Sequence, residues 1–454
     1  MNVAASRLDL TALIDERPVS RFQVWMLVLL GASVVMDGFD AQAMGFVAPA
    51  IIRAWGVDKA ALGPVFGASL MGMLVGSLVL SPLADRIGRR PVLIGSTVFF
   101  GLCMLATPLA TNLAQLFGVR FVTGLGLGGI MSNAMALAGE YSPKRRRVSL
   151  MMWVSCGFTA GAMLGGVVSA ALIPRWGWIS VFFVGGAIPL GIAALMLRFL
   201  PESMQFLVVH GRSLVRVRSW IARIAPDVRI SDDAQPFVSE TKPSGALVAE
   251  LFRNGRTGFT LLLWGINFMN LLNLFFLSSW LPTLVTSGGH DLSTAVLAGT
   301  VLQFGGVLGT VAMGPVIDRI GFYRVLVPVF AIAAVAVFAI GQPALSLVAL
   351  FLVIFVSGLC IVGGQPAINA LAATLYPTSV RSTGVGWSLG IGRAGSIVGP
   401  VVAGQLIGWH WTGSELFMAA AVPAGLSCIM LAVMARMKAA HPPAGGSPRS
   451  VPRS

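Results

Sequence analysis

The sequence predicts an all-α membrane protein of twelve transmembrane helices, arranged as two pseudo-symmetric six-helix bundles. Three observations support this fold class. The 454 residues are 56% hydrophobic and only 11% charged, so much of the apolar surface must face something other than water. The apolar residues gather in about twelve runs that are long enough to cross a bilayer. The two halves of the chain also repeat one another, as shown below.

The expected helices follow from the length of each apolar run. A spanning helix needs about 20 mostly apolar residues, because the hydrocarbon layer is about 30 Å thick and each residue adds about 1.5 Å. Frequent Gly and Pro are compatible with such helices. The predicted spans are residues 22–50, 60–82, 91–110, 114–138, 148–173, 178–200, 257–286, 293–317, 324–341, 345–370, 382–408 and 414–436.

These spans divide the chain into five parts. A cytoplasmic N-terminal segment (1–21) precedes the first bundle (22–200), and a polar cytoplasmic linker with a short surface helix (201–256) leads to the second bundle (257–436) and a disordered cytoplasmic tail (437–454). The four cysteines fall inside predicted spans without metal-ligand spacing, and the chain has no nucleotide loop or nucleophile constellation. We therefore expect no metal, no cofactor and no enzymatic activity. The sequence does not reveal the oligomeric state, for which a monomer is the default expectation.

The net charge of +14 is distributed unevenly. If the spans alternate, the basic clusters at 85–90, 144–147, 201–256, 318–324 and the tail all lie on one side, and the opposite side carries only Arg53, Lys59 and Arg175. This asymmetry is the positive-inside pattern. It predicts a multi-pass protein of the bacterial cytoplasmic membrane with both termini in the cytoplasm, and it makes a nucleic-acid partner unnecessary.

An internal repeat relates the two halves. SPLADRIGRRPVLI (81–94) and GPVIDRIGFYRVLV (314–327) place Asp85 and Asp318 233 positions apart. A shift of 235 then aligns GGIMSNAMALAGEYSPKRRR with GGQPAINALAATLYPTSVRS and pairs Gly157 with Gly392. Twofold-repeated proteins of twelve helices are commonly transporters that rock one half against the other around a site near the midplane.

The motifs resemble those of a known superfamily. DRIGRR, its degenerate repeat DRIGFYR, RFVTGLGLGG (120–129) and PESMQFL (201–207) resemble the major facilitator superfamily. Within it, DGFD (37–40), WLPTLV (280–285) and the stretch 376–400 are similar to the aromatic acid:proton symporter family. Ser81, Phe322 and Tyr323 depart from the usual loop pattern. The resemblance implies the major facilitator fold and proton-coupled transport of a small aromatic carboxylate by alternating access.

Two acids lie inside the first span. Asp37 and Asp40 share one face of a helix, and Gly38 leaves the backbone between them open to a neighbour or to water. An ionised carboxylate at the bilayer centre costs roughly 2.5 to 3.5 kcal/mol. The acids must therefore line a wet cavity, pair with a cation, or take up protons as a coupled pair. We predict a role in proton coupling, with a static ion pair as the alternative.

Two arginines are the expected cationic partners. Counting residues from the outer surface places Arg120 and Asp40 at a similar depth, so we predict that Arg120 shares the proton-coupling role, with a purely structural role as the alternative. Arg393 lies near the midplane, and its counterpart in the repeat is Phe158. Because guanidinium is a planar fork that matches a carboxylate, we predict that Arg393 binds the substrate carboxylate. Structural pairing with an acid is its alternative.

An aromatic acid also needs a flat apolar slot and partners for ring hydroxyls. The candidates for the substrate site are Asn133, Gln303, Gln365, Asn369, Phe158 and Trp387. Asn267 and Asn270 are likewise able to bond a ring hydroxyl, and Trp153 and Phe304 are at positions compatible with the same cavity. Buried amides are the stronger indicators, because uncharged polar groups in hydrocarbon still need partners.

Charged residues in the two repeated loops are expected to act as gates. They are Asp85, Arg86, Arg89, Asp318 and Arg319. Placed at the cytoplasmic ends of helices, they can form ion pairs between the halves that hold one state closed, which the resemblance also implies. The simpler interpretation of the arginines is a solvated topology signal.

The predicted function is therefore import of a hydroxybenzoate-like carboxylate together with protons, with the substrate, protons and the lipid bilayer as partners. Three other functions use the same features. They are export or antiport of organic acids or hydrophobic compounds, sugar transport, which the acids and midplane arginine disfavour, and a membrane sensor that binds the acid without moving it.

Overall fold

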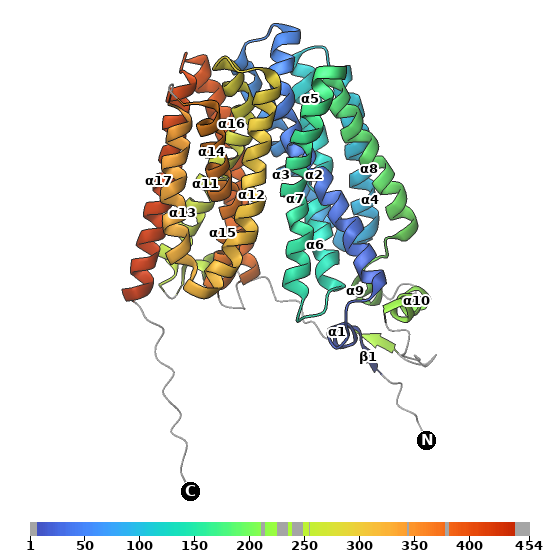
Figure 1. Ribbon diagram of the computed structural model, residues 1–454. Coiled ribbons are helices and arrows are strands. Elements are labelled where there is room, and N and C mark those ends of the chain that lie inside the picture. Colours follow the sequence, from blue (N-terminus) through green and yellow to red (C-terminus); the bar gives the residue numbers. More distant parts are fainter. Residues whose placement is uncertain are drawn as a thin grey trace, which may run out of the picture.

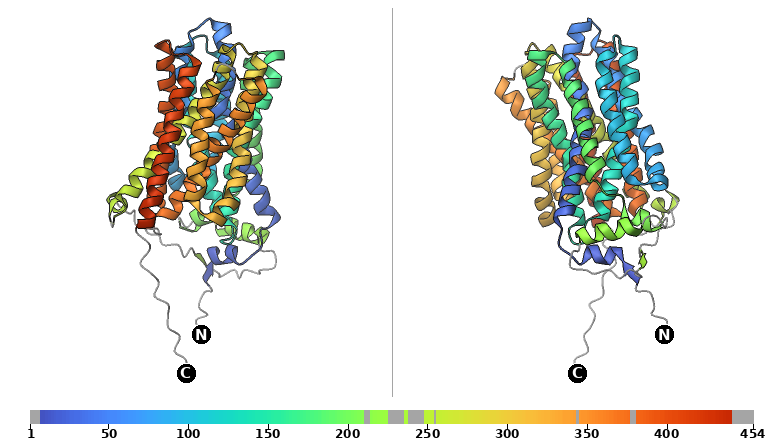
Figure 2. Two further views of the ribbon diagram at one scale, coloured as in Figure 1. Left: turned by 60° about the vertical axis from the view of Figure 1, so that its left-hand side comes forward. Right: turned by 90° about the vertical axis from the view of Figure 1, so that its right-hand side faces the viewer.

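The computed structural model describes residues 7–209, 214–224, 235–237, 248–253, 255–342, 345–376 and 381–440. Long helices dominate these ranges and run side by side between two ends of the molecule (Figure 1). The two turned views confirm that the long helices form one bundle, with the short elements α9 and α10 at one end (Figure 2). The all-helical membrane fold is confirmed.

The first half contains six spans. They are α2 (Arg21–Trp55), α3 (Gly63–Ile87), α4 (Arg89–Ala106), α5 (Leu113–Leu127) continued by α6 (Ile130–Glu140), α7 (Arg147–Trp176) and α8 (Ile179–Phe199). Short 3-10 turns lie at Lys59–Leu62 (η1) and Thr107–Leu109 (η2). The first helix starts with a capping box, in which Ser20 and Gln23 each bond the other's backbone N–H.

The second half has the same order. Its spans are α11 (Thr257–Ser287), α12 (Leu292–Ile320), α13 (Phe322–Ile340), α14 (Leu347–Ser357) continued through the π-helical turn η4 (Gly358–Val362) into α15 (Gly363–Leu375), α16 (Arg381–Gly408) and α17 (Gly413–Ala440). In the described part of the chain, 11 helices are long and apolar enough to cross a membrane. The twelfth predicted span is α16, which is long enough but carries Arg393 and many glycines.

The sequence repeat is visible in the helix packing. Gly72 and Gly76 of α3 face the backbone of α5 at Phe121 and Leu125, and Gly305 and Gly309 of α12 face the backbone at Phe355 and Leu359. Each glycine is 233 positions from its counterpart, the same shift that relates the two DRIG motifs. The glycines that end those motifs, Gly88 and Gly321, have φ values of 110° and 89°, which only glycine adopts without strain.

Close backbone contact also joins α2 to α7 beside the paired acids. A Cβ atom at Gly38 would overlap the carbonyl oxygen of Phe158, whereas Gly31, two turns earlier, has no atom within 4 Å of such a Cβ. We expect Gly38→Ala to lower stability by about 1 to 3 kcal/mol, because the two backbones must separate. Gly31→Ala should be neutral or slightly stabilising. Thermal unfolding in detergent should show this difference, and equal midpoints for both variants would contradict the packing.

The two halves meet most closely at the end of the bundle where α2 ends and α3 begins. There a Cβ at Gly63 would lie 2.9 Å from the Cα of Gly404, and Lys59 Nζ donates to Ser287 Oγ at 2.8 Å. Phe66 packs edge-on against Trp280, with ring centroids 4.9 Å apart. At the opposite end, α6 packs on α2, α4 and α7, and α15 packs on α11, α12 and α16, which are helices of their own half. The space between the halves is thus closed at the first end.

Several short elements cover the end that carries the start of α2. They are α1 (Leu10–Asp15), α9 (Met204–Val209), α10 (Leu214–Ile224) and η3 (Val248–Phe252). Strand β1 (Arg7–Asp9) pairs in parallel with β2 (Gln235–Phe237) of the linker. The sequence did not predict this contact, because three residues are too few to show the alternation of apolar and polar residues that marks a strand.

The predicted disordered tail is wrong for residues 437–440, which continue α17. Residues 441–454 lie outside the described residues.

Candidate functional site

Asp40 and Arg120 form a buried ion pair within the first half. Arg120 Nη1 donates to Asp40 Oδ1 at 2.6 Å, and Nη2 donates to Oδ2 at 2.7 Å. The two residues are 0% and 1% exposed. The pairing expected from their similar depth is therefore present. The bidentate geometry satisfies both carboxylate oxygens and leaves the pair neutral as a unit.

Asp37 has no such partner. Its side chain is fully buried on α2, and neither carboxylate oxygen has a hydrogen-bond partner. Burying an ionised carboxylate without a partner is far more costly than burying its neutral form. The two acids of the DGFD motif thus differ sharply in surroundings, although their positions in the sequence look equivalent.

Arg393 is a residue of the second half that lies near Asp37 of the first half. It lies on α16, and its Nη1 donates to Ser77 Oγ of α3 at 2.9 Å, a hydrogen bond across the two halves. It is near enough to Asp37 for their charges to interact, but among the described residues no acid lies within ion-pairing distance of it. A half-buried guanidinium held by one hydroxyl keeps most of its five donors available for a ligand.

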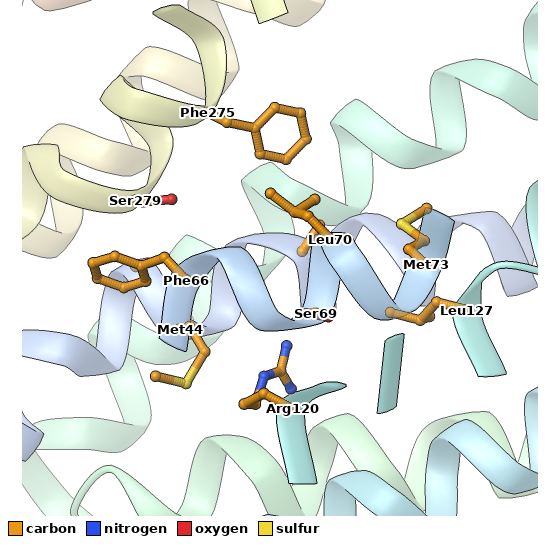
Figure 3. A pocket seen from close by; sticks show the side chains of 11 residues that line it. Met44, Phe66, Ser69, Leu70, Met73, Arg120, Leu127, Phe275 and Ser279 are labelled. Atoms are coloured by element: carbon orange, nitrogen blue, oxygen red, sulfur yellow. The ribbon is translucent and has the colours of Figure 1, made fainter. Parts of the chain in front are cut away.

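A small pocket lies between the halves next to the Asp40–Arg120 pair. Figure 3 shows Arg120 directed toward α3, with Phe275 and Ser279 of α11 on the other side. Most of the lining is apolar and comes from Ala41, Met44, Gly45, Phe66, Leu70, Met73, Leu127 and Phe275, with Ser69, Ser279 and Arg120 as the polar members. Arg120 therefore borders space that both halves enclose, while Arg393 lies outside this lining.

A chain of amides crosses the second half close to Arg393. Asn270 Nδ2 donates to Gln365 Oε1 at 2.7 Å, and Gln365 Nε2 donates to Asn267 Oδ1 at 2.9 Å and to Asn369 Oδ1 at 3.1 Å. Asn267 Nδ2 in turn donates to Ser388 Oγ at 2.6 Å. We call these five residues the amide cluster. All four of its amides were predicted to be able to bond a ring hydroxyl, and two of them, Gln365 and Asn369, were predicted for the substrate site.

The other predicted substrate residues lie outside the amide cluster. Asn133 Nδ2 donates to the Gly129 carbonyl of its own helix at 2.7 Å, and Gln303 Nε2 donates to Ser278 Oγ at 3.1 Å. Phe158 lies where α7 contacts α2 beside Asp37. Trp387 is 45% exposed and stacks on Trp264, with ring centroids 5.8 Å apart. The structure thus joins Gln365 and Asn369 in a cluster that reaches α16, the helix of Arg393, and gives the amides of Asn133 and Gln303 other partners.

The predicted gate residues lie at the end where the halves are not closed. Asp85, Arg86, Asp318 and Arg319 are exposed, and in the described ranges none of them forms an ion pair within 4.0 Å. Only Arg89 is paired, with Glu140 of the same half. The expected ion pairs between the halves are therefore not present among the described residues in this state, in which the halves meet at the opposite end.

Glu202 fixes the start of α4 beside Arg89. Its Oε1 accepts from the backbone N–H groups of Arg89, Arg90 and Ser203 at 3.0, 3.1 and 2.8 Å, which satisfies N–H groups that a helix start leaves free. Tyr141 Oη donates to the Glu202 carbonyl at 2.5 Å. Burial, and then the Glu202 carboxylate, raise the pKa of Tyr141 well above its ordinary value, so its hydroxyl remains a donor.

Comparison with known proteins identifies the family. A profile of the Major Facilitator Superfamily matches residues 30–262 and 263–453, one match for each half. The chain belongs to the Major Facilitator Superfamily. Within this superfamily it groups with aromatic acid transporters rather than with any enzyme. The fold class and the family resemblance predicted from the sequence are confirmed.

Relatives and solved structures support this assignment at different levels. The chain is 42% identical to a 4-hydroxybenzoate transporter of Pseudomonas aeruginosa, covering 97% of this chain and 98% of the relative. It is 38% identical to a gallate transporter of Pseudomonas putida, over 88% and 89% of the two chains. A bacterial homologue of the human lysosomal transporter Spinster, solved in an inward-facing and occupied conformation, matches with a TM-score of 0.69 at 16% identity, over 92% and 98% of the chains. That last likeness concerns the fold alone.

Sequence reasoning missed several residues of this major facilitator site. Ser77 and Ser388 bond Arg393 and Asn267, but serine is common in membrane helices and gives no signal of its own. Glu140 and Glu202, which hold Arg89 and its helix, could have been found as acids at span ends next to basic loops. The unequal surroundings of Asp37 and Asp40 depend on side-chain packing and had no sequence signal.

Proposed function

We propose that this transporter imports a small aromatic carboxylate, such as a hydroxybenzoate, together with protons across the bacterial cytoplasmic membrane by alternating access. The observation that carries the proposal is the placement of Arg393. Within the described part of the chain, the guanidinium of Arg393 in the second half has one hydrogen bond, to a hydroxyl of the first half, and it lies near the carboxyl of Asp37, whose oxygens have no hydrogen-bond partner there. The names of relatives at 42% and 38% identity support an aromatic carboxylate as the substrate.

In this proposal Arg393 receives the substrate carboxylate. Its planar fork can donate to two carboxylate oxygens at once, and the Ser77 hydroxyl to which it now donates is a neutral partner that an anion displaces easily. Because Ser77 and Arg393 belong to different halves, exchanging this bond for a substrate bond changes a contact between the halves. Substrate binding would thereby bias their relative position.

Asp37 carries the coupled proton in this proposal. Among the described residues no donor bonds its oxygens and no cation lies within ion-pairing distance, so burial favours its neutral form. When the opposite side opens, water and the Arg393 charge would favour release of the proton. Asp40 is bound to Arg120 at both oxygens and serves instead as part of a fixed pair. Import of an anion with more than one proton would also draw on the membrane potential.

The closed end of the bundle is the periplasmic end, if the basic loops mark the cytoplasmic side. The state described here is then open toward the cytoplasm, with Gly63 against Gly404 as part of the closed periplasmic gate. We propose that the DRIG loops, with Asp85, Arg86, Arg89, Asp318 and Arg319, close the cytoplasmic gate in the other state. Breaking their contacts should alter transport rate more than substrate affinity.

Uptake into right-side-out membrane vesicles tests the function. Labelled 4-hydroxybenzoate should accumulate severalfold more when the outside is acidic than when no pH gradient is imposed, and a vesicle lacking the protein should accumulate little. Expulsion of preloaded acid under the same gradient would favour an antiporter. Binding without any movement of label would favour a sensor, and either result would overturn the proposed import.

A further inference from the structure

The hydrogen bonds of the amide cluster form a directed chain that begins with a donor on Asn270 and ends at Ser388. Asn270 donates to Gln365, Gln365 donates to Asn267, and Asn267 donates to Ser388. Asn270 Nδ2 also donates to the Ile361 carbonyl at 3.2 Å. Turning the Asn270 amide over would bring its oxygen against two acceptors, so the network fixes its orientation.

This orientation leaves one acceptor of the cluster without a donor. Asn270 is 1% exposed, and its Oδ1 is buried with no hydrogen-bond partner, the one amide oxygen of the cluster in that condition. A buried acceptor left unsatisfied is costly. A ligand that offers it an O–H group relieves that cost, whereas a ligand that offers only C–H does not.

Asn270 and Arg393 lie at similar depths on neighbouring helices. Both α11 and α16 start at the same end of the bundle and pack against each other (Figure 1). At about 1.5 Å per residue, Asn270 lies about 20 Å along α11 and Arg393 about 18 Å along α16. The two helices touch at this level, because a Cβ at Gly392, next to Arg393, would lie 3.5 Å from the Cβ of Asn267. Partial exposure of Gln365 and Asn369 makes the cluster accessible from its edge.

We infer that Asn270 determines specificity for ring-hydroxylated aromatic acids by accepting a hydrogen bond from the ring hydroxyl. The inference rests on the proposed function, in which Arg393 holds the carboxylate at the other end of the same ring. Discrimination by a built acceptor is strong, since a site made to bond a hydroxyl is left with an unpaired group when the analogue lacks it. The substrate class is therefore a monocyclic carboxylate with a hydroxyl donor, and unsubstituted benzoate is the poorer substrate.

The test compares three ligands in the unmodified transporter and in variants of Asn270, so that the interaction is isolated from general damage. Half-saturation for uptake is measured with 4-hydroxybenzoate, benzoate and 4-methoxybenzoate, which keeps the oxygen but has no donor. The unmodified transporter should favour 4-hydroxybenzoate over each of the other two by about tenfold. In Asn270→Leu, and in Asn270→Ala as the variant without added bulk, this ratio should fall to near one, while benzoate uptake remains.

Asn273→Leu is the matched control. Asn273 is also buried on α11 and its Oδ1 likewise lacks a hydrogen-bond partner, but it lies one turn further along and outside the amide cluster. If the ring hydroxyl is bound at Asn270, replacing Asn273 should leave the ratio unchanged. The inference is overturned if the unmodified protein does not distinguish the ligands, if the Asn270 variants keep the ratio, if they lose all three ligands equally, or if Asn273→Leu removes the preference instead. Failure of the unmodified protein to move any aromatic acid would be a failure of the proposed function, which is a different result.

Discussion

Arg393→Ala is expected to abolish accumulation of an aromatic carboxylate while the protein still reaches the membrane. Arg393 of α16 donates a hydrogen bond to Ser77 of α3. Within the described residues it forms no ion pair, so its loss would not leave a carboxylate without its counter-charge. Its removal should therefore cost little stability. Loss of a buried charged partner for the substrate should weaken binding by about 2 to 5 kcal/mol, which corresponds to roughly 30-fold or more.

Two further variants separate the substrate contact from the contact between the halves. Ser77→Ala removes the same hydrogen bond from the other side and should change uptake only a few-fold, since a neutral hydrogen bond contributes about 1 kcal/mol. Arg393→Lys keeps the charge but loses the planar fork, and it should retain a small part of the activity. If Ser77→Ala were as inactive as Arg393→Ala, the essential role would be the contact between halves, and undiminished uptake by Arg393→Ala would remove the carboxylate assignment.

The fold could be predicted because membrane insertion imposes strong and local rules. Apolar length, basic loops and the DRIG repeat all report on the same twelve-helix plan, and the helices observed match the predicted spans closely. The glycines at helix contacts explain why the repeat between the two halves can be recognised in the sequence. Gly72 and Gly305 stand at the same contact in the two halves, so the packing of the duplicated spans constrains the same sequence positions.

The site was predicted only in part, because its chemistry depends on which side chains pair with one another. Depth counting was sufficient to pair Asp40 with Arg120, since an ion in the membrane needs a partner at its own level. It could not show that Arg120 would satisfy one acid completely and leave Asp37 alone. Depth counting also could not predict how the amide groups are oriented, because the orientation of Asn270 depends on two acceptors, Gln365 Oε1 of α15 and the Ile361 carbonyl of η4.

The two halves differ at the site in a way that suits their proposed tasks. The first half holds the acids Asp37 and Asp40 together with Arg120, and the second holds Arg393 and the amide cluster. The repeat places Phe158 where Arg393 would have its counterpart, and that residue packs against α2 beside Asp37. The residues proposed for proton coupling and for substrate binding thus lie on opposite sides of the interface between the halves, where a change in its position could link the two roles.

Asp37→Asn and Asp40→Asn are expected to fail for different reasons, although both change one acid of the same motif to its amide. Asp37→Asn replaces a carboxyl that has no partner with a neutral group of similar shape. Its thermal stability should be unchanged or higher, and a pH gradient should no longer increase uptake. Exchange of labelled for unlabelled substrate, which needs no net proton movement, should persist.

Asp40→Asn instead leaves the buried guanidinium of Arg120 without its counter-charge. Breaking a buried pair from one side costs about 3 to 5 kcal/mol, so this variant should unfold at lower temperature and reach the membrane in smaller amounts. The double variant Asp40→Leu with Arg120→Leu removes both charges and should recover much of the stability. If Asp40→Asn proved stable and lost its response to the pH gradient while Asp37→Asn kept it, the proton would belong to Asp40, and the ion pair with Arg120 would be the coupling element.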